Sequence, residues 1–327
     1  MERNGVKRLS LLLGLTLALT TGLRASDSAQ TNDVPSVLIV VGAPGEEEFG
    51  KQFAQWAQRL QQACRTGGAH VSTIGLSSNA VSDYDSVKAF FEAEPKTGAE
   101  LWLILIGHGT FDSKEAKFNL AGPDLSASEL AQWLKPFSRP LAIINCASAS
   151  SPFLNKLSGK NRVIVTATKS GFEQNFCRFG DYFSKAIADP AADLDKDGQT
   201  SLLEAFLSAA AATDEFYKTE GRLATEHPLL DDNGDGFGTP ADFFRGVRSV
   251  KKPDGGRTID GLRAHQFHLV RSDLERKLPH DVRVRRDDLE LKAAQLRERK
   301  SELGEEAYYR QLEPMLLELA RLYQSAQ

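Results

Sequence analysis

The sequence has only three cysteines among its 327 residues, which excludes a disulfide-stapled scaffold and any zinc module built from several cysteines. It also lacks a basic excess: 40 lysines and arginines stand against 44 aspartates and glutamates, so the net charge of −4 does not indicate a nucleic-acid partner. After residue 25, no apolar run is long enough to cross a membrane. With 41% hydrophobic residues, the composition is that of an ordinary folded protein.

The N-terminus has the order of a secretory signal peptide. Basic residues within 1–8 precede an apolar run over 9–19, and small residues then lead to Ala25. We therefore predict cleavage near Ala25 and export to the periplasm or the medium. Removing residues 1–25 takes away four basic residues and one acidic residue, which changes the net charge from −4 to −7. The alternative is an uncleaved membrane anchor.

Beyond a polar linker over 26–35, short apolar segments alternate with amphipathic ones. The predicted strands are 36–41, 71–76, 101–106, 141–144 and 162–167. The predicted helices include 47–64, 81–91 and 126–134, the last with a capping box made by Ser126 and Glu129. Strands that are apolar throughout and alternate with helices indicate an α/β fold with a mostly parallel sheet between two helical layers.

The composition changes near residue 246, where arginine, glutamate and leucine become frequent. Leucines at helical spacing over 285–323 predict two helices in a hairpin, interrupted at Gly304. The predicted organisation is a signal peptide over 1–25, a linker over 26–35, an α/β domain over 36–245 and a helical C-terminal extension over 246–327.

Two chemically active side chains each follow a predicted strand. His108 follows 101–106 in the run Ile-Gly-His-Gly, and Cys146 follows 141–144 in the run Ile-Asn-Cys-Ala. Carboxyl ends of parallel strands meet at one edge of a sheet, so an imidazole there can move protons for a thiol nucleophile. The backbone N–H groups of Gly109 and Cys146 can together face a developing oxyanion. The alternative is a pair of structural residues, a small apolar cysteine and a hydrogen-bonded histidine.

The segments LWLILIGHG and LAIINCAS resemble the caspase, legumain and gingipain clan of cysteine peptidases, in which one apolar strand ends in His-Gly and a later one in the catalytic cysteine. Legumains are the most similar of these, since their Gly-Asp-Trp-Tyr-Ser motif is matched by Gly-Asp-Tyr-Phe-Ser over 180–184. The resemblance covers about 36–245 and implies a caspase-like fold, catalytic roles for His108, Cys146 and Gly109, and a substrate-binding role for Asp181.

Two departures from the legumain pattern concern substrate choice. Ile144 stands where legumains have an acidic residue two positions before the cysteine. Only Lys51 is basic in 46–51, the region that corresponds to a legumain arginine. With Asp181 in the pocket and Lys51 as its nearby basic candidate, we expect asparagine or a basic residue before the cleaved bond.

Residues 193–204 match the twelve-residue loop of an EF-hand, which binds Ca²⁺ through oxygen ligands. Gly198 takes the sixth position, where the chain must turn sharply, and Thr200 departs from the usual apolar eighth position. The predicted ligands, at positions one, three, five, seven, nine and twelve, are Asp193, Asp195, Asp197, Gln199, Ser201 and Glu204. The alternative is an aspartate-rich surface turn.

A second acidic run over 231–242 repeats the pattern with a shorter acid at position twelve. Its predicted ligands are Asp231, Asn233, Asp235, Phe237 and Asp242. His227 and Pro228 precede it and argue against a full incoming helix. In either loop we expect Ca²⁺ to be structural rather than catalytic.

The sequence as a whole predicts an exported cysteine endopeptidase that cleaves proteins or peptides through a Cys146–His108 dyad and is stabilised by calcium. The alternative is a catalytically inactive, caspase-like calcium-binding or scaffold module. Cys64 and Cys177 are expected to be structural, or to pair with each other in an oxidising compartment.

Overall fold

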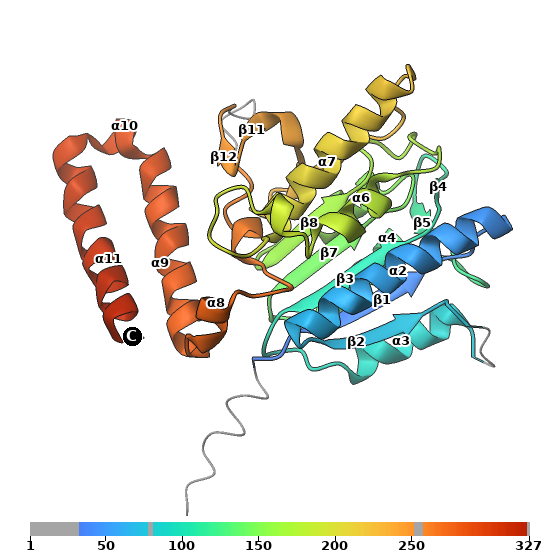
Figure 1. Cartoon of the computed structure of the whole chain (residues 1–327), viewed down its shortest axis with the longest axis horizontal. Helices are drawn as coiled ribbons and strands as arrows, with labels where there is room; N and C mark the ends of the chain where they lie inside the picture. Colours follow the sequence, from blue (N-terminus) through green and yellow to red (C-terminus); the bar gives the residue numbers. More distant parts are fainter. Residues whose placement is uncertain (1–32, 78–80, 252–257, 326–327) are drawn as a thin grey trace, which may run out of the picture.

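The computed structural model describes residues 33–77, 81–251 and 258–325. The predicted signal peptide and residues 26–32 of the predicted linker lie outside the described residues. A central sheet is covered by helices on both faces, and a helical hairpin extends to one side (Figure 1).

The central sheet contains seven described strands in the spatial order β2-β1-β3-β7-β8-β9-β10. The parallel strands are β1 (Ser36–Val41), β2 (His70–Ile74), β3 (Leu101–Ile106), β7 (Leu141–Asn145) and β8 (Arg162–Thr166). Two short strands continue the sheet antiparallel, β9 (Leu229–Asp231) and β10 (Thr239–Pro240). The prediction of a mostly parallel sheet is confirmed, and each of the five predicted strands ends within two residues of its expected limits.

Each face of the sheet has its own core and its own helices. One face packs against α2 (Glu47–Gly67), α6 (Phe179–Ala186) and α7 (Leu202–Thr219). The other packs against α3 (Asp83–Ala93), α4 (Ala127–Leu134) and α5 (Ser151–Leu157). Successive residues of β3 alternate between the two cores, so all six are apolar and buried. The predicted capping box of Ser126 and Glu129 begins α4.

Several short elements were not predicted. A small sheet of β4 (Gly109–Phe111), β5 (Ala116–Phe118) and β6 (Leu125–Ser126) follows His108 directly. β11 (Phe244–Arg245) and β12 (Arg248–Ser249) pair with each other, and the 3₁₀ helices are η1 (Pro190–Ala192), η2 (Ala241–Phe243) and η4 (Ala264–Gln266). Segments of two or three residues are too short to show a hydrophobic period, because periodicity needs several repeats.

The α/β core extends past residue 245, where the helical extension was expected to begin. Ala264, Phe267 and Leu269 are buried in the core beside α2 and α7. The helical extension instead begins with α8 (Asp273–Lys277), followed by α9 (His280–Glu298), α10 (Lys300–Leu303) and α11 (Glu305–Ser325).

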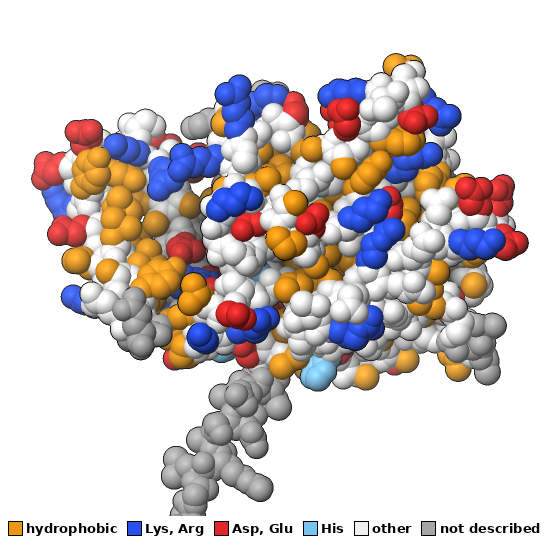
Figure 2. Space-filling model, viewed as in Figure 1, with side chains coloured by type: hydrophobic (Ala, Val, Ile, Leu, Met, Phe, Trp, Pro, Cys, Tyr) orange, Lys and Arg blue, Asp and Glu red, His pale blue; other side chains and the backbone are white. Residues whose placement is uncertain are grey.

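The predicted C-terminal hairpin is confirmed. Gly304 separates its last two helices with a φ of 76°, which glycine adopts at little cost. Figure 2 shows hydrophobic side chains on the outer surface of the hairpin, where Leu316 and Leu317 are exposed. None of the helices in the described ranges combines the length and apolar character needed to cross a membrane.

Candidate active site

His108 lies just beyond the carboxyl end of β3, in a box of aromatic rings. Its ring centroid is 5.1 Å from that of Phe49, 5.2 Å from that of Phe53 and 6.1 Å from that of Phe176. The Nε2 atom lies 3.2 Å from the carbonyl oxygen of Pro44. Because a carbonyl can only accept, Nε2 must carry the proton in this contact, which leaves Nδ1 as the basic nitrogen of the neutral ring.

Cys146 follows β7 and lies under α6 on the same face of the sheet as α2. Its residue exposure is only 2%, and a Cβ atom added to Gly180 of α6 would lie 2.9 Å from the Cys146 Cβ. The thiol makes no hydrogen bond with any described residue. Burial raises the pKa of this thiol, and the nearby Glu226 carboxylate raises it further. Both influences oppose the formation of a thiolate.

The two side chains share a face of the sheet but do not form a hydrogen-bonded pair. The Cys146 N–H donates to the Leu105 carbonyl oxygen at 2.9 Å, so Cys146 continues the β3–β7 ladder beside Ile106. His108 lies two residues farther along β3 and turns toward Pro44. The structure therefore brings the predicted dyad to one sheet edge without thiol–imidazole contact.

The N–H groups predicted to hold an oxyanion already have acceptors. The Gly109 N–H donates to the Ser148 hydroxyl at 3.0 Å, and that hydroxyl in turn donates to the Gly109 carbonyl at 3.0 Å. The Cys146 N–H is taken by Leu105. Neither group is open to an oxyanion in this structure, so their shared role stays a prediction.

Asp181 lies on α6 between two cations. Its carboxylate is 2.7 Å from Arg59 of α2 and 2.6 Å from Lys185, one turn farther along α6. Lys51, the basic residue expected near it, instead pairs with Glu47. No described contact joins Asp181 to His108 or Cys146, so its predicted pocket role stays a prediction.

All three cysteines are free and buried. The optional Cys64–Cys177 disulfide is not formed. Burial raises the pKa of Cys64 to about 12, and burial together with Glu226 raises that of Cys177 well above its usual value. The raised pKa values of Cys64 and Cys177 agree with the structural role that the sequence suggested for these two residues.

Glu226 is the buried group that sequence reasoning missed. Its carboxylate is 2% exposed and accepts the N–H groups of Arg178 and Phe179, at the start of α6, and the hydroxyl of Tyr217. It thus fixes the helix that covers Cys146. A single glutamate in an irregular segment carries no sequence pattern that points to such a role.

The first acidic loop, defined as residues 193–204, has the backbone of a cation-binding turn. The Asp193 carboxylate accepts the N–H groups of Lys196 at 2.6 Å and Gly198 at 3.0 Å. One oxygen each from Asp193, Asp195 and Asp197 lie within 4.8 Å of one another. Three of the six predicted ligands therefore converge, and their oxygens suit a hard cation such as Ca²⁺.

Glu204 closes the first acidic loop from α7. It is 1% exposed and forms a capping box with Ser201, while its other oxygen accepts the N–H of Leu194 at 2.7 Å. His265, which the sequence did not connect with this loop, lies with its Nε2 2.9 Å from an oxygen of Asp195.

The second acidic loop, defined as residues 231–242, keeps the same turns, and its last predicted ligand forms an ion pair. Asn233 Oδ1 accepts the N–H of Asp235 at 2.8 Å, and Asp235 accepts that of Phe237 at 2.8 Å. Asp242 lies in η2, exposed, and its carboxylate is 2.5 Å from Lys251. Asp242 as a ligand stays a prediction, and in this structure its charge is paired with Lys251.

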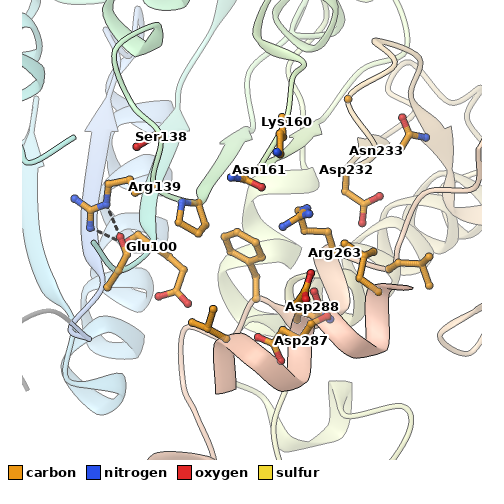
Figure 3. A pocket seen from close by; sticks show the side chains of 18 of the residues that line it. Glu100, Ser138, Arg139, Lys160, Asn161, Asp232, Asn233, Arg263, Asp287 and Asp288 are labelled. Atoms are coloured by element: carbon orange, nitrogen blue, oxygen red, sulfur yellow. Dashed lines mark hydrogen bonds between the residues drawn. The ribbon is translucent and has the colours of Figure 1, made fainter. Parts of the chain in front are cut away.

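A cavity of about 1380 Å³ opens at the opposite edge of the sheet, next to the residues that precede β3, β7 and β8 (Figure 3). Arg263 and Asp232 reach it from one side, and Asp287 and Asp288 of α9 from another. This amino edge is remote from the strand ends that carry His108 and Cys146, so the cavity is separate from the candidate active site.

No protein-family model matches the chain, and no curated protein matches it. Two insect caspases are among the similar solved structures. The Drosophila initiator caspase Dronc has a TM-score of 0.44 at 12% identity, over 72% of this chain and 96% of that chain. Caspase-1 from Spodoptera frugiperda has a TM-score of 0.41 at 9% identity, over 62% of this chain and 87% of that chain. The resemblance to legumains stays a prediction.

Proposed function

We propose that this chain is an exported, calcium-stabilised scaffold of caspase-like type that binds a protein or peptide partner without cleaving it. The observation that carries the proposal is the burial of Cys146 under Gly180, beside the carboxylate of Glu226. A nucleophilic cysteine needs an accessible sulfur in electropositive surroundings, and this thiol has neither.

The engaged N–H groups support the same conclusion. Removing a single oxyanion donor costs about 10²–10³ in rate in enzymes that use one. Here Ser148 holds the Gly109 N–H and Leu105 holds the Cys146 N–H, so a tetrahedral intermediate would have to displace both acceptors.

A partner would meet an exposed aromatic side chain at the carboxyl edge of the sheet. Phe172, in the segment after β8, is 71% exposed, and its ring lies 5.3 Å from that of Phe111 in β4. Aromatic rings of this kind provide large contact areas in protein interfaces. We therefore place the contact with a protein or peptide at Phe111 and Phe172.

Calcium is proposed for the first acidic loop. Three carboxylates gather there, and a divalent cation offsets the repulsion between them. Asp193, Asp195 and Asp197 would supply side-chain oxygens, and Gln199 its carbonyl. Glu204 would contribute from α7. The ion would be structural, since neither His108 nor Cys146 contacts the loop.

Peptide hydrolysis is the second candidate, and one observation favours it. The Pro44 carbonyl fixes the tautomer of His108 and leaves Nδ1 free to act as a base, which is the orientation that a catalytic imidazole needs. Activity would require α6 to move away from Cys146 and Ser148 to release Gly109.

Thiol labelling of the folded, exported chain distinguishes the two candidates. A thiol-reactive peptidyl inhibitor should leave Cys146 unmodified, and iodoacetamide should modify it only after denaturation. Mass spectrometry of the digested protein reads both. Selective inhibitor labelling of Cys146, lost in the His108→Ala variant, would establish the peptidase instead.

A peptide library gives the second readout. We expect no cleavage by the parent or by Cys146→Ala. If the parent cleaves and Cys146→Ala does not, while Cys64→Ala and Cys177→Ala keep activity, the scaffold proposal fails. The residue preferred before the cut would then test the roles of Asp181 and Arg59.

A further inference from the structure

The second acidic loop contains a buried carboxylate oxygen that lacks a partner. Asp231 ends β9 and is 1% exposed. Its Oδ1 accepts the N–H of Gly234 at 3.0 Å, but its Oδ2 makes no hydrogen bond with any described residue. A buried carboxylate oxygen without a donor is costly, so this oxygen favours either a bound proton or a bound cation.

The neighbouring positions present more oxygens to the same turn. Asn233 donates its Nδ2 to the Thr258 carbonyl at 3.0 Å, which leaves its Oδ1 inside the loop as an acceptor. Asp235 follows two residues later. Burial raises the pKa of the Asp231 carboxyl, and the charge of Asp235 raises it further. Gly234 and Gly236 have φ angles of 82° and 77°, which wrap the chain around these three side chains.

A hydroxyl from a distant segment completes the site. Ser158 is the C-cap of α5, and its buried Oγ makes no hydrogen bond with the described residues. It lies 4.0 Å from the place where a Cβ on Gly236 would sit, and close enough to the Asp231 carboxyl to lower the pKa of that group. Asn155 fixes this approach by donating to the Gly236 carbonyl at 2.7 Å.

We propose that the second acidic loop binds one divalent cation of the Ca²⁺ type through Asp231, Asn233, Asp235 and the residue 237 carbonyl, with Ser158 replacing Asp242. The donor set is entirely oxygen, which suits a hard cation. It contains only two carboxylates, against four in the first acidic loop, and fewer charges give weaker binding. The site is independent of the function proposed above, because it touches neither the carboxyl edge of the sheet nor the first loop.

Calorimetric titration of the full exported chain with CaCl₂ tests the proposal. The parent should bind two molar equivalents of Ca²⁺, one with higher affinity and one with lower affinity. Asp235→Asn should remove the weaker equivalent, and Glu204→Gln the tighter one. If the parent binds one Ca²⁺ ion, and this binding is lost in Glu204→Gln but kept in Asp235→Asn, the second acidic loop does not bind the cation. A single equivalent lost only in Asp235→Asn would instead overturn calcium binding at the first loop.

Ser158→Ala and Asp242→Asn form the matched pair for the ligand set. Ser158→Ala should weaken the second equivalent by about tenfold, while Asp242→Asn should leave its dissociation constant unchanged. The reverse result would return Asp242 to the site and contradict the proposal.

Asp231→Asn separates a bound cation from a simple buried acid, because asparagine has the shape of a protonated aspartate. The proposal expects this variant to fold in chelator and to lose the weaker equivalent. If it unfolds, Asp235→Asn, at an exposed position, decides the question. An unchanged titration in both variants means that Asp231 is only a protonated core residue.

Discussion

The two acidic loops share one local backbone and differ in what their surroundings do with it. In each, the aspartate at position one accepts the N–H of position four, at 2.6 Å for Lys196 and 3.0 Å for Gly234. In each, positions four and six have positive φ. Position twelve differs, because Glu204 is buried at the start of α7 while Asp242 is exposed beside Lys251.

This difference shows what a twelve-residue pattern specifies. Turns at positions four and six follow from short-range hydrogen bonds within the loop. The last ligand depends on the element that follows, since α7 returns Glu204 to the loop and η2 directs Asp242 away.

The largest effect is expected at position twelve in the absence of metal. Glu204→Gln places an amide NH₂ group among the N–H groups of Leu194 and Ser201, so unfolding free energy should fall by about 3 kcal/mol. Urea denaturation in chelator measures this. Asp242→Asn is the control and should change stability by less than about 0.5 kcal/mol. Equal losses in the two variants would show that both loops depend on position twelve alike.

Calcium should stabilise the protein mainly through the first acidic loop. At a hundredfold excess over the dissociation constant the gain is about 2.7 kcal/mol, since the ion binds the folded loop preferentially. A rise of several degrees in Tm follows for a domain of this size. Thermal unfolding in Ca²⁺ and in chelator should show that Asp195→Asn removes most of this shift and the surface control Asp214→Asn removes none. If the parent unfolds at the same temperature in Ca²⁺ and in chelator, the first acidic loop does not bind calcium.

A half-buried histidine beside the first acidic loop, His268, should make the protein acid-sensitive. Burial lowers the pKa of His268 to about 4, from an ordinary value near 6.5. The unfolded chain therefore takes up a proton before the folded one, and stability is complete above pH 6.5 and falls as the pH drops toward 4. Between pH 7 and pH 5 the loss should be about 2 kcal/mol.

Urea denaturation at pH 7 and pH 5 measures this loss. His268→Gln should flatten the difference between the two pH values, whereas His70→Gln, at an exposed position of β2, should leave it unchanged. A parent that is equally stable at both pH values contradicts the assignment.

The smallest effect concerns position four. Gly234→Ala should destabilise by about 1 kcal/mol, because the residue has a φ of 82° and a Cβ there would lie 3.0 Å from the Gly159 backbone. Lys196→Gly should change stability by less than that, since relief of its φ of 66° offsets the lost contact between its ammonium group and the Asp193 carbonyl. Chemical denaturation in chelator measures the unfolding free energy of both variants. A larger decrease in Lys196→Gly than in Gly234→Ala would contradict this prediction.

Local pattern was enough to predict most of the framework. The five parallel strands, the capping box at Ser126 and the break at Gly304 each depend on residues within one or two turns of chain. The central strands are largely apolar because helices cover both faces of the sheet, and such apolar runs can be recognised from the sequence alone. The same holds for the turns of both acidic loops, which form from side chains two to five residues away.

The partners of the site residues were decided only by tertiary structure. The sequence placed His108 and Cys146 at one edge, but it could not reveal that Gly180 of α6 packs against the Cys146 Cβ or that Glu226 lies nearby. Arg59 at Asp181 and Ser158 at Asp231 likewise come from segments more than 70 residues distant. Hydrophobic periodicity fixes which face of an element is buried, whereas the reactivity of a thiol or carboxylate depends on the few atoms that surround it. Those atoms are brought together by the packing of the whole chain.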